Sequence, residues 1–446
     1  MEQSNNPNFL LDEYLLKAGI IFLPISTDLG AIFITLVILN LWKKKYKSII
    51  NDPLNQSFGL LFVLLVIVSI LAIYPILSFG GLANFIPSIL MVMSFPFLLN
   101  NYNRLYKLAW WLVLVSLPLC FFGFMQLFYG WETPLFLNKV GIQLIAYGRP
   151  EGRVSSFFMY ANTLAFYLVT TFTLSLGLWI YHYQNRKNFN GYQNSFQLSI
   201  LLIAVFANGL GLILTHSRSA WGLALLSLIS FVAYLELYWI LICVILLIFL
   251  IAWAAWFPFY QHIVREIIPD YFWARLTDEL YDDRHITALR TTQWSVAWEM
   301  MLKRPFWGWG LRNFTPIYQQ KMNVWMGHPH NLFLMLLAEI GILGTSLLSI
   351  IVGTILGKAT ISLFQVKQAC SSHKSFEKSI DKRNKKLLLF TYVNAFILCT
   401  IFNLFDVSIF DFKINVIGWL LLSSIIGVVY HNQSPIKQDY DDNNLY

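Results

Sequence analysis

The sequence predicts an all-α polytopic membrane protein with 11 or 12 transmembrane helices and one long extracytoplasmic loop. Three observations support this fold class. Hydrophobic residues make up 57% of the 446 residues, and the mean hydropathy is +0.59. Only 12% of the residues are charged, about half the share in ordinary soluble proteins. Apolar stretches of about 20 residues recur along the chain, and a helix of that length crosses the hydrocarbon core of a bilayer.

The apolar stretches give the expected spans in order. The first, at about 10–42, is either one long span or two short ones, because Pro24 and Asp28 can interrupt it. All spans are expected to form a single integral membrane domain over residues 1–430, followed by a polar tail at 431–446. The remaining spans are expected at about 58–79, 83–99, 108–128, 159–181, 196–214, 220–236, 238–256, 330–356, 388–408 and 412–430.

Basic segments fix the expected orientation of these spans. They fall on one face of the predicted membrane domain, which the positive-inside rule assigns to the cytoplasm together with the tail. The formal net charge of +8 therefore marks cytoplasmic loops, and no nucleic-acid partner is predicted. The basic segments are "KKKYK" at 43–47, "NRLYK" at 103–107, "NRK" at 185–187 and the loop at about 357–387. The extracytoplasmic face receives the loops at 129–158, 215–220 and about 257–328.

Two arginines on the extracytoplasmic side are candidate binding residues. Arg218 lies in "THSRSA", a turn so short that its guanidinium must stay near the membrane surface, and charges held at membrane depth tend to mark sites. Arg153 lies in a longer loop before the next span. The alternative for both is an arginine that reaches lipid phosphates from the membrane surface, and this alternative weighs more for Arg153.

The segment "GHPHN" supplies the candidate base. A neutral imidazole takes a proton from a hydroxyl at neutral pH, so His330 is the candidate catalytic residue and His328 a possible supporting one. The alternative is a hydrogen-bonded histidine at a helix start. Metal binding would need further ligands. With none near in the sequence, neither a metal nor another cofactor is predicted.

Two carboxylates are possible supporting residues. Asp406, near the extracytoplasmic end of another span, is a possible partner that orients a histidine. Glu339 follows His330 by nine residues, which places it about 180° around an ideal helix and about 13 Å along it. Glu339 is therefore better interpreted as a buried carboxylate that ties its helix to a neighbour.

The long extracytoplasmic loop contains a predicted amphipathic helix at 289–301. Leu289, Val296, Ala297 and Met300 share one face of that helix. The helical segment is expected to end at Pro305, which Gly308 and Gly310 follow. Its tryptophans are typical of the interfacial aromatic belt, with sugar stacking as the alternative.

The charged residues suggest a chemistry. Arginine binds phosphate oxygens bidentately and stays charged, so Arg153 and Arg218 at the membrane surface suit a diphosphate attached to a lipid. An extracytoplasmic enzyme has no nucleotide sugar, so the activated donor must arrive as a lipid diphosphate sugar. The arginines would neutralise the leaving diphosphate without a metal. His330 would deprotonate the acceptor hydroxyl, with inversion at the anomeric carbon.

Four motifs in this order resemble the O-antigen ligase and polymerase superfamily. They are "RVSSFFMYANTLAFY", "THSRSAWG", "KRPFWGWGLRNF" and "GHPHNLFLMLLAEIGILG". The resemblance implies a bacterial inner-membrane enzyme that transfers a glycan from undecaprenyl diphosphate on the periplasmic face. Its acceptor would be a glycan or a lipid A-core-type molecule. It also implies His330 as the base and Arg218 and Arg153 as the diphosphate clamp.

The sequence alone does not exclude other functions. Some proteins of this superfamily are described as bicarbonate transporters, so a transporter of bicarbonate or another small anion is the main alternative, and a flippase for lipid-linked sugars is another. A transporter would bury its charges near the middle of the bilayer, between interrupted helices. The candidate residues of this chain lie at the edge of the spans instead, which favours the enzyme.

Overall fold

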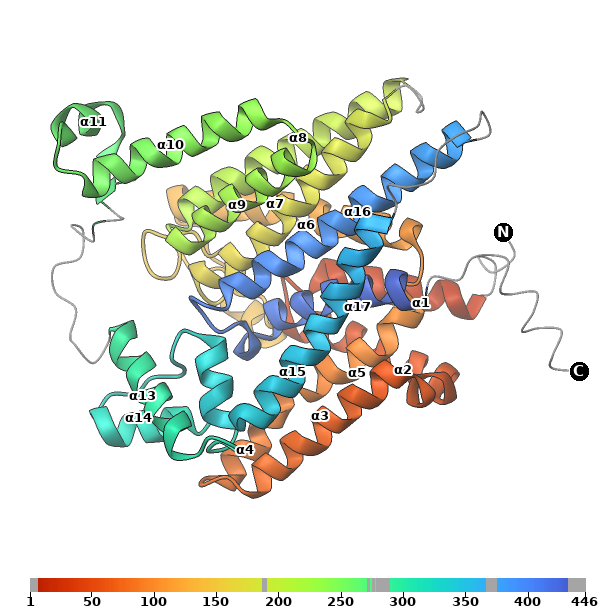
Figure 1. Cartoon of the computed structure of the whole chain (residues 1–446), viewed down its shortest axis with the longest axis vertical. Helices are drawn as coiled ribbons and strands as arrows, with labels where there is room; N and C mark the ends of the chain where they lie inside the picture. Colours follow the sequence, from red (N-terminus) through yellow and green to blue (C-terminus); the bar gives the residue numbers. More distant parts are fainter. Residues whose placement is uncertain are drawn as a thin grey trace, which may run out of the picture.

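The computed structural model describes residues 7–186, 191–270, 273–274, 277, 289–365 and 375–431. Over these residues the protein is a bundle of helices without strands, and its only β contacts are two isolated bridges (Figure 1). This confirms the predicted all-α class. Of the predicted tail, residues 432–446 lie outside the described residues, as does the middle of the basic loop expected at 357–387.

The first apolar stretch forms two helices, which decides between the two expected arrangements. α1 (Pro7–Phe22) and α2 (Thr27–Asn51) are separated by a turn that contains Pro24. The side chain of Ser26 accepts the N–H of Leu29 at 3.2 Å and so caps the start of α2. The break therefore lies at the position that Pro24 and Asp28 indicated.

The next spans begin at similar local signals. α3 (Pro53–Ile70) has proline in its first turn, and Asp52 caps it by accepting the N–H groups of Leu54 and Asn55. The run expected at 58–79 is wrong at its end, because α3 stops at Ile70 and Pro75 begins a new helix. That helix, α4 (Pro75–Gly81), continues through a short turn into α5 (Ile86–Ser94), and α6 (Tyr102–Tyr129) follows.

The centre of the bundle is α7 (Ala161–Gln184). Of its most apolar 18-residue stretch, 83% is buried inside the protein. Its hydroxyl groups bond to neighbouring helices, as Thr171 does to Asn208 at 2.8 Å and Thr173 to Ser227 at 3.0 Å, which satisfies polar groups within the membrane. The helices around it are α6, α8 (Gly191–Leu214), α9 (Arg218–Tyr234), α16 (Ser375–Phe402) and α17 (Phe412–Tyr430).

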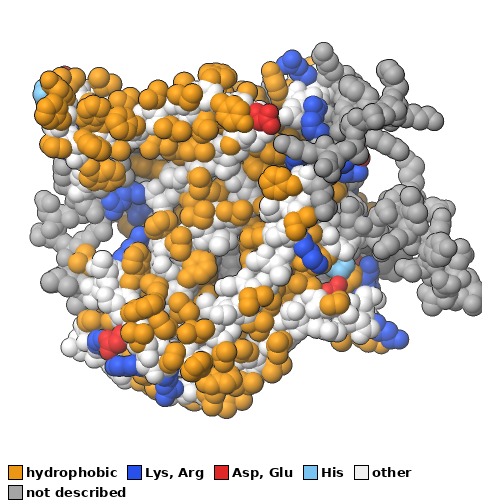
Figure 2. Space-filling view, viewed as in Figure 1, with side chains coloured by type: hydrophobic (Ala, Val, Ile, Leu, Met, Phe, Trp, Pro, Cys, Tyr) orange, Lys and Arg blue, Asp and Glu red, His pale blue; other side chains and the backbone are white. Residues whose placement is uncertain are grey.

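Nine helical segments of the described chain are long and apolar enough to cross a membrane. α1 and α9, with 16 and 17 residues, and α2, which ends in the basic segment, are not among these nine. Counting these three as well gives 12, the upper of the two expected numbers. The peripheral span α10 (Tyr238–Trp256) is only 11% buried over its most apolar stretch. Hydrophobic side chains cover much of the visible face of the bundle, which suits contact with lipid chains (Figure 2).

The predicted loop helix is confirmed. α13 (Arg290–Lys303) buries Val296, Ala297 and Met300, and these side chains pack on α14 (Phe314–Met322) and on α15 (Leu332–Gln365). A further short helix of this loop is α11 (Gln261–Ile267).

α15 is not one continuous helix. Gly341 has φ +67° and ψ −176°, and the segment after α13 inserts at this break. Gly310 N–H donates to the Glu339 carbonyl at 2.8 Å, and Ile342 N–H donates to the Pro305 carbonyl at 2.7 Å. A Cβ on Gly341 would lie 2.2 Å from the Phe306 carbonyl oxygen, so only glycine fits there.

The bundle has two distinct ends. At one end, which we call the loop end, lie α11, α13 and α14 (Figure 1). The opposite end, which we call the basic end, gathers the basic segments through contacts between distant parts of the chain. Lys44 pairs with Asp12 at 2.7 Å and Lys107 with Glu13 at 2.7 Å.

Candidate active site

The two histidines lie on a loop at the loop end that other elements hold in place. Trp294 of α13 donates to the Pro329 carbonyl at 3.0 Å, and Thr315 of α14 donates to the Gly327 carbonyl at 3.0 Å. His330 has φ +51°, a left-handed conformation that is uncommon for residues other than glycine and that tends to occur at functional sites. The fold therefore imposes this conformation on the segment directly before α15.

Asp406 lies against both histidines. It belongs to the segment between α16 and α17, and its Oδ1 is 3.3 Å from His330 Nδ1 and 3.9 Å from His328 Nε2. Burial disfavours the charged form of Asp406. The hydrogen bond and charge of His330, the charge of His328 and the Val407 N–H outweigh burial and lower the pKa of Asp406 to about 2. The carboxylate is therefore ionised at neutral pH.

These contacts assign the tautomer of each ring. Ionised Asp406 only accepts hydrogen bonds, so His330 carries its proton on Nδ1 and leaves Nε2 with a free lone pair. The His330 backbone N–H donates to Nδ1 of His328 at 3.2 Å, so His328 carries its proton on Nε2. Burial and the neighbouring His330 lower the pKa of His328 to about 4, which keeps this ring neutral. One imidazole is thus arranged to accept a proton at Nε2.

Arg153 joins the same network through a residue of α7. Its guanidinium donates to the side-chain oxygen of Asn162 at 2.8 Å and to the Thr215 carbonyl at 2.8 Å. Asn162 in turn donates to Oδ2 of Asp406 at 3.2 Å. A continuous chain of hydrogen bonds therefore runs from Arg153 through Asn162 and Asp406 to His330.

The remaining predicted residues lie in two places. Arg218 is the first residue of α9, three residues after Thr215, so its backbone is close to the turn that Arg153 binds. Glu339 is buried and separate from the histidines. Its Oε1 accepts the N–H of Phe314 at 3.2 Å, so it joins α15 to the start of α14.

Sequence reasoning missed three residues of this network. Asn162 carries no charge and lies within the expected span at 159–181, so the sequence did not single it out. Arg312 stacks on Phe410, with its guanidinium carbon 4.1 Å from the ring centroid, and its charge contributes to the lowered pKa of His328, as does that of Arg290. Arg312 lies in the motif "KRPFWGWGLRNF", which was the one available signal for it.

The histidines and Asp406 also form a possible metal site. The sequence indicated no third ligand near His328 and His330, and the fold supplies one from a distant segment. Their donor atoms lie within 4.8 Å of one another. In the assigned tautomer, however, His328 directs an N–H, not a lone pair, toward Asp406. In that tautomer these contacts arrange His330 for proton transfer.

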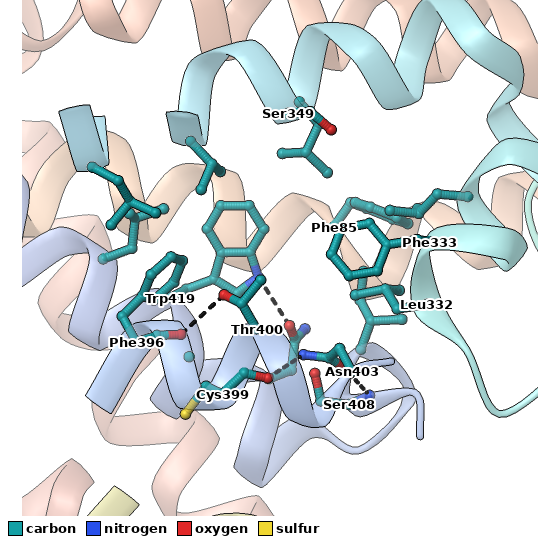
Figure 3. A pocket seen from close by; sticks show the side chains of 18 of the residues that line it. Phe85, Leu332, Phe333, Ser349, Phe396, Cys399, Thr400, Asn403, Ser408 and Trp419 are labelled. Carbon is teal, nitrogen blue, oxygen red and sulfur yellow. Dashed lines mark hydrogen bonds between the residues drawn. The ribbon is translucent and has the colours of Figure 1, made fainter. Parts of the chain in front are cut away.

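A cavity of about 320 Å³ lies next to this network, between α15, α16 and α17. Its lining includes Leu332 and Asn403 but none of His330, Arg153 and Arg218. Figure 3 shows Leu332 and Phe333 on one side of the cavity and Phe396 and Trp419 on the other.

These features define a multi-pass helical membrane protein with an arginine–histidine–aspartate site at one end of its bundle. Residues 200–349 match the O-Antigen ligase family, which supports the O-antigen ligase and polymerase superfamily. The match contains three of the four motifs, and the motif that begins at Arg153 lies outside it. The match indicates a glycosyltransferase-type enzyme of polysaccharide biosynthesis. It includes Arg218, His328 and His330. Comparison with curated proteins gives no match.

Proposed function

We propose that this protein transfers a glycan from an undecaprenyl diphosphate donor to an acceptor hydroxyl. The observation that carries this proposal is the contact between His330 and ionised Asp406, which leaves Nε2 of His330 as a base. The family match supports the reaction class. The hydrogen-bonded chain to Arg153 links that base to a cation suited to phosphate.

The proposed reaction proceeds in one displacement. Nε2 of His330 takes the proton of the acceptor hydroxyl while its oxygen attacks the anomeric carbon. The bond from that carbon to the diphosphate oxygen breaks, and its electron pair stays on the diphosphate. Arg153 and Arg218 neutralise the charge that develops there, so no metal takes part. Attack from the side opposite the leaving group inverts the configuration, and His330 later returns its proton to water.

Asp406 has two roles in this proposal. It holds the His330 ring in the tautomer that leaves Nε2 free, and it stabilises the imidazolium that forms after proton transfer. Asn162 has a positioning role, because it binds both Asp406 and Arg153. Its amide would keep the base at a fixed distance from the diphosphate-binding cation.

The proposed site faces the periplasm of the bacterial inner membrane. Positive charge at the basic end favours the cytoplasm for that end, so the loop end would face the opposite compartment. The charged residues of the site are gathered at the loop end and not at the middle of the spans, which favours this enzyme over a transporter of bicarbonate or another anion.

The experiment is transfer by the purified protein in nanodiscs. The donor is a synthetic undecaprenyl diphosphate oligosaccharide, and the acceptors are a lipid A-core-type molecule and a second lipid-linked glycan. His330→Ala is expected to lower kcat by about 100-fold or more, as for loss of a general base. His262→Ala, which changes an exposed histidine of α11, is the matched control. Undiminished activity of His330→Ala, or retained anomeric configuration in the product, would refute the mechanism.

A further inference from the structure

The cavity between α15, α16 and α17 is built from the same segments as the candidate site. Leu332 lines it two residues after His330, and its N–H donates to the Asn403 carbonyl at 2.8 Å. Asn403 lines it three residues before Asp406. On α7, Phe166 lines the cavity one helical turn after Asn162, on the same face of that helix. The cavity therefore begins directly next to the His330–Asp406–Asn162 network.

The cavity walls offer little to a polar ligand. Most of the polar side chains that line it make hydrogen bonds within the protein: Asn403 donates to the Cys399 carbonyl at 2.9 Å, and Thr400 donates to the Phe396 carbonyl at 2.9 Å. Trp419 likewise donates to Asn415 at 2.9 Å. Most of the remaining wall is aromatic or aliphatic. The aromatic members are Phe85, Phe166, Phe333, Phe396 and Trp419.

The shape of the cavity is elongated along the membrane helices. From Leu348 to Leu356 it follows α15 over nine residues, about 12 Å of helix. On α17 it extends from Asn415 to Leu422. A slot that starts at the site and continues along the spans suits a chain, whereas a compact group would leave most of it empty.

We propose that this cavity binds the first isoprene units of the polyisoprenoid chain of the donor. This inference rests on the proposed function. In a lipid diphosphate sugar only the diphosphate separates the reacting carbon from the lipid chain, so the chain must leave the site within a few bonds of His330. The lipid of an acceptor is joined to its reacting hydroxyl through intervening sugars and needs no cavity at this place. Burial of the apolar chain would add to the affinity that the arginines provide.

Two glycines allow the cavity to be filled without disturbing the fold. Gly353 of α15 and Gly418 of α17 both line it, and a Cβ at either position meets no atom within 4 Å. Gly353→Phe and Gly418→Phe therefore insert a ring into open space. Gly357 lies one turn further along α15, is equally open and does not line the cavity, so Gly357→Phe is the matched control.

The test compares two donors that carry the same glycan diphosphate, a long donor on undecaprenol and a short donor on a methyl group, which has no isoprene unit to enter the cavity. Gly353→Phe and Gly418→Phe are expected to raise KM for the long donor by about tenfold, the scale of losing a few buried carbons. The kcat for the short donor should stay within about twofold of wild type, and Gly357→Phe should change neither value. Unchanged thermal unfolding of each variant shows that it is folded.

A binding measurement makes the inference independent of turnover. A photoreactive polyisoprenyl diphosphate without sugar is expected to label α15 and α17 peptides in wild type and to lose that labelling in Gly353→Phe. An unchanged preference for the long donor in both phenylalanine variants would overturn the cavity assignment while the proposed function stands. Labelling that excess phospholipid abolishes would assign the cavity to bulk lipid instead. Absence of transfer in wild type, with cavity labelling retained, would overturn the proposed function alone.

Discussion

Replacing Asp406 with asparagine removes one negative charge and alters little else. The asparagine amide can donate to Nδ1 of His330, which would move the ring proton to Nε2, so that the ring could no longer accept a proton there. The expected loss in rate follows from the interactions that the carboxylate makes with its surroundings. Its pKa lies at about 2 against an ordinary value of 3.8, which corresponds to about 2 kcal/mol of net stabilisation of the charged form.

The charged form of Asp406 owes this stabilisation to the groups around it. The hydrogen bond and charge of His330 and the charge of His328 contribute most of it against the effect of burial. Removing the carboxylate removes a charge-assisted hydrogen bond to the imidazolium that forms during proton transfer, and loss of such a bond typically costs about 2 kcal/mol. This corresponds to about a 30-fold lower rate, and the changed tautomer should lower it further.

The assay is single-turnover transfer in nanodiscs with saturating donor. Asp411→Asn is the matched control, because Asp411 lies in the same segment and caps α17, and asparagine caps a helix as well as aspartate does. Asp406→Asn should lose at least about 30-fold in rate, with Asp411→Asn close to wild type. Equal rates in Asp406→Asn and wild type, or equal losses in both variants, would refute the assigned role of Asp406.

Two further predictions concern the same network. Asn162→Leu removes the bridge between Arg153 and Asp406 and should lower kcat about tenfold, with little change in thermal unfolding. Recovery of kcat in Asn162→Gln would show that Asn162 acts by positioning its neighbours and not by packing. His328 should make the protein less stable in acid, because its pKa is about 4 when folded and 6.5 when unfolded, so the unfolded chain binds the proton first as pH falls. Between pH 7 and pH 5 this should cost about 2 kcal/mol. Thermal unfolding of His328→Gln should show a smaller loss over that interval, and a larger loss would contradict the assignment.

The sequence determined the features that depend on local patterns. Spans of about 20 apolar residues, the interruption at Pro24 and the buried face of α13 follow from helix geometry and hydrophobicity, and the structure confirms them. Prolines and capping residues also explain where helices start, as at Asp52.

The partners of the candidate residues could not be predicted in the same way. Asp406 lies 76 residues from His330 in sequence and was one of two carboxylates considered, whereas Glu339, much nearer in the chain, binds the start of α14. The sequence did not predict Arg312 or Asn162 as residues of the site, because neither belongs to a periodic pattern. Such pairings depend on how whole helices pack and on how distant loops meet at one end of the bundle. Local sequence determines each helix, but only the tertiary packing decides which side chains come together between them.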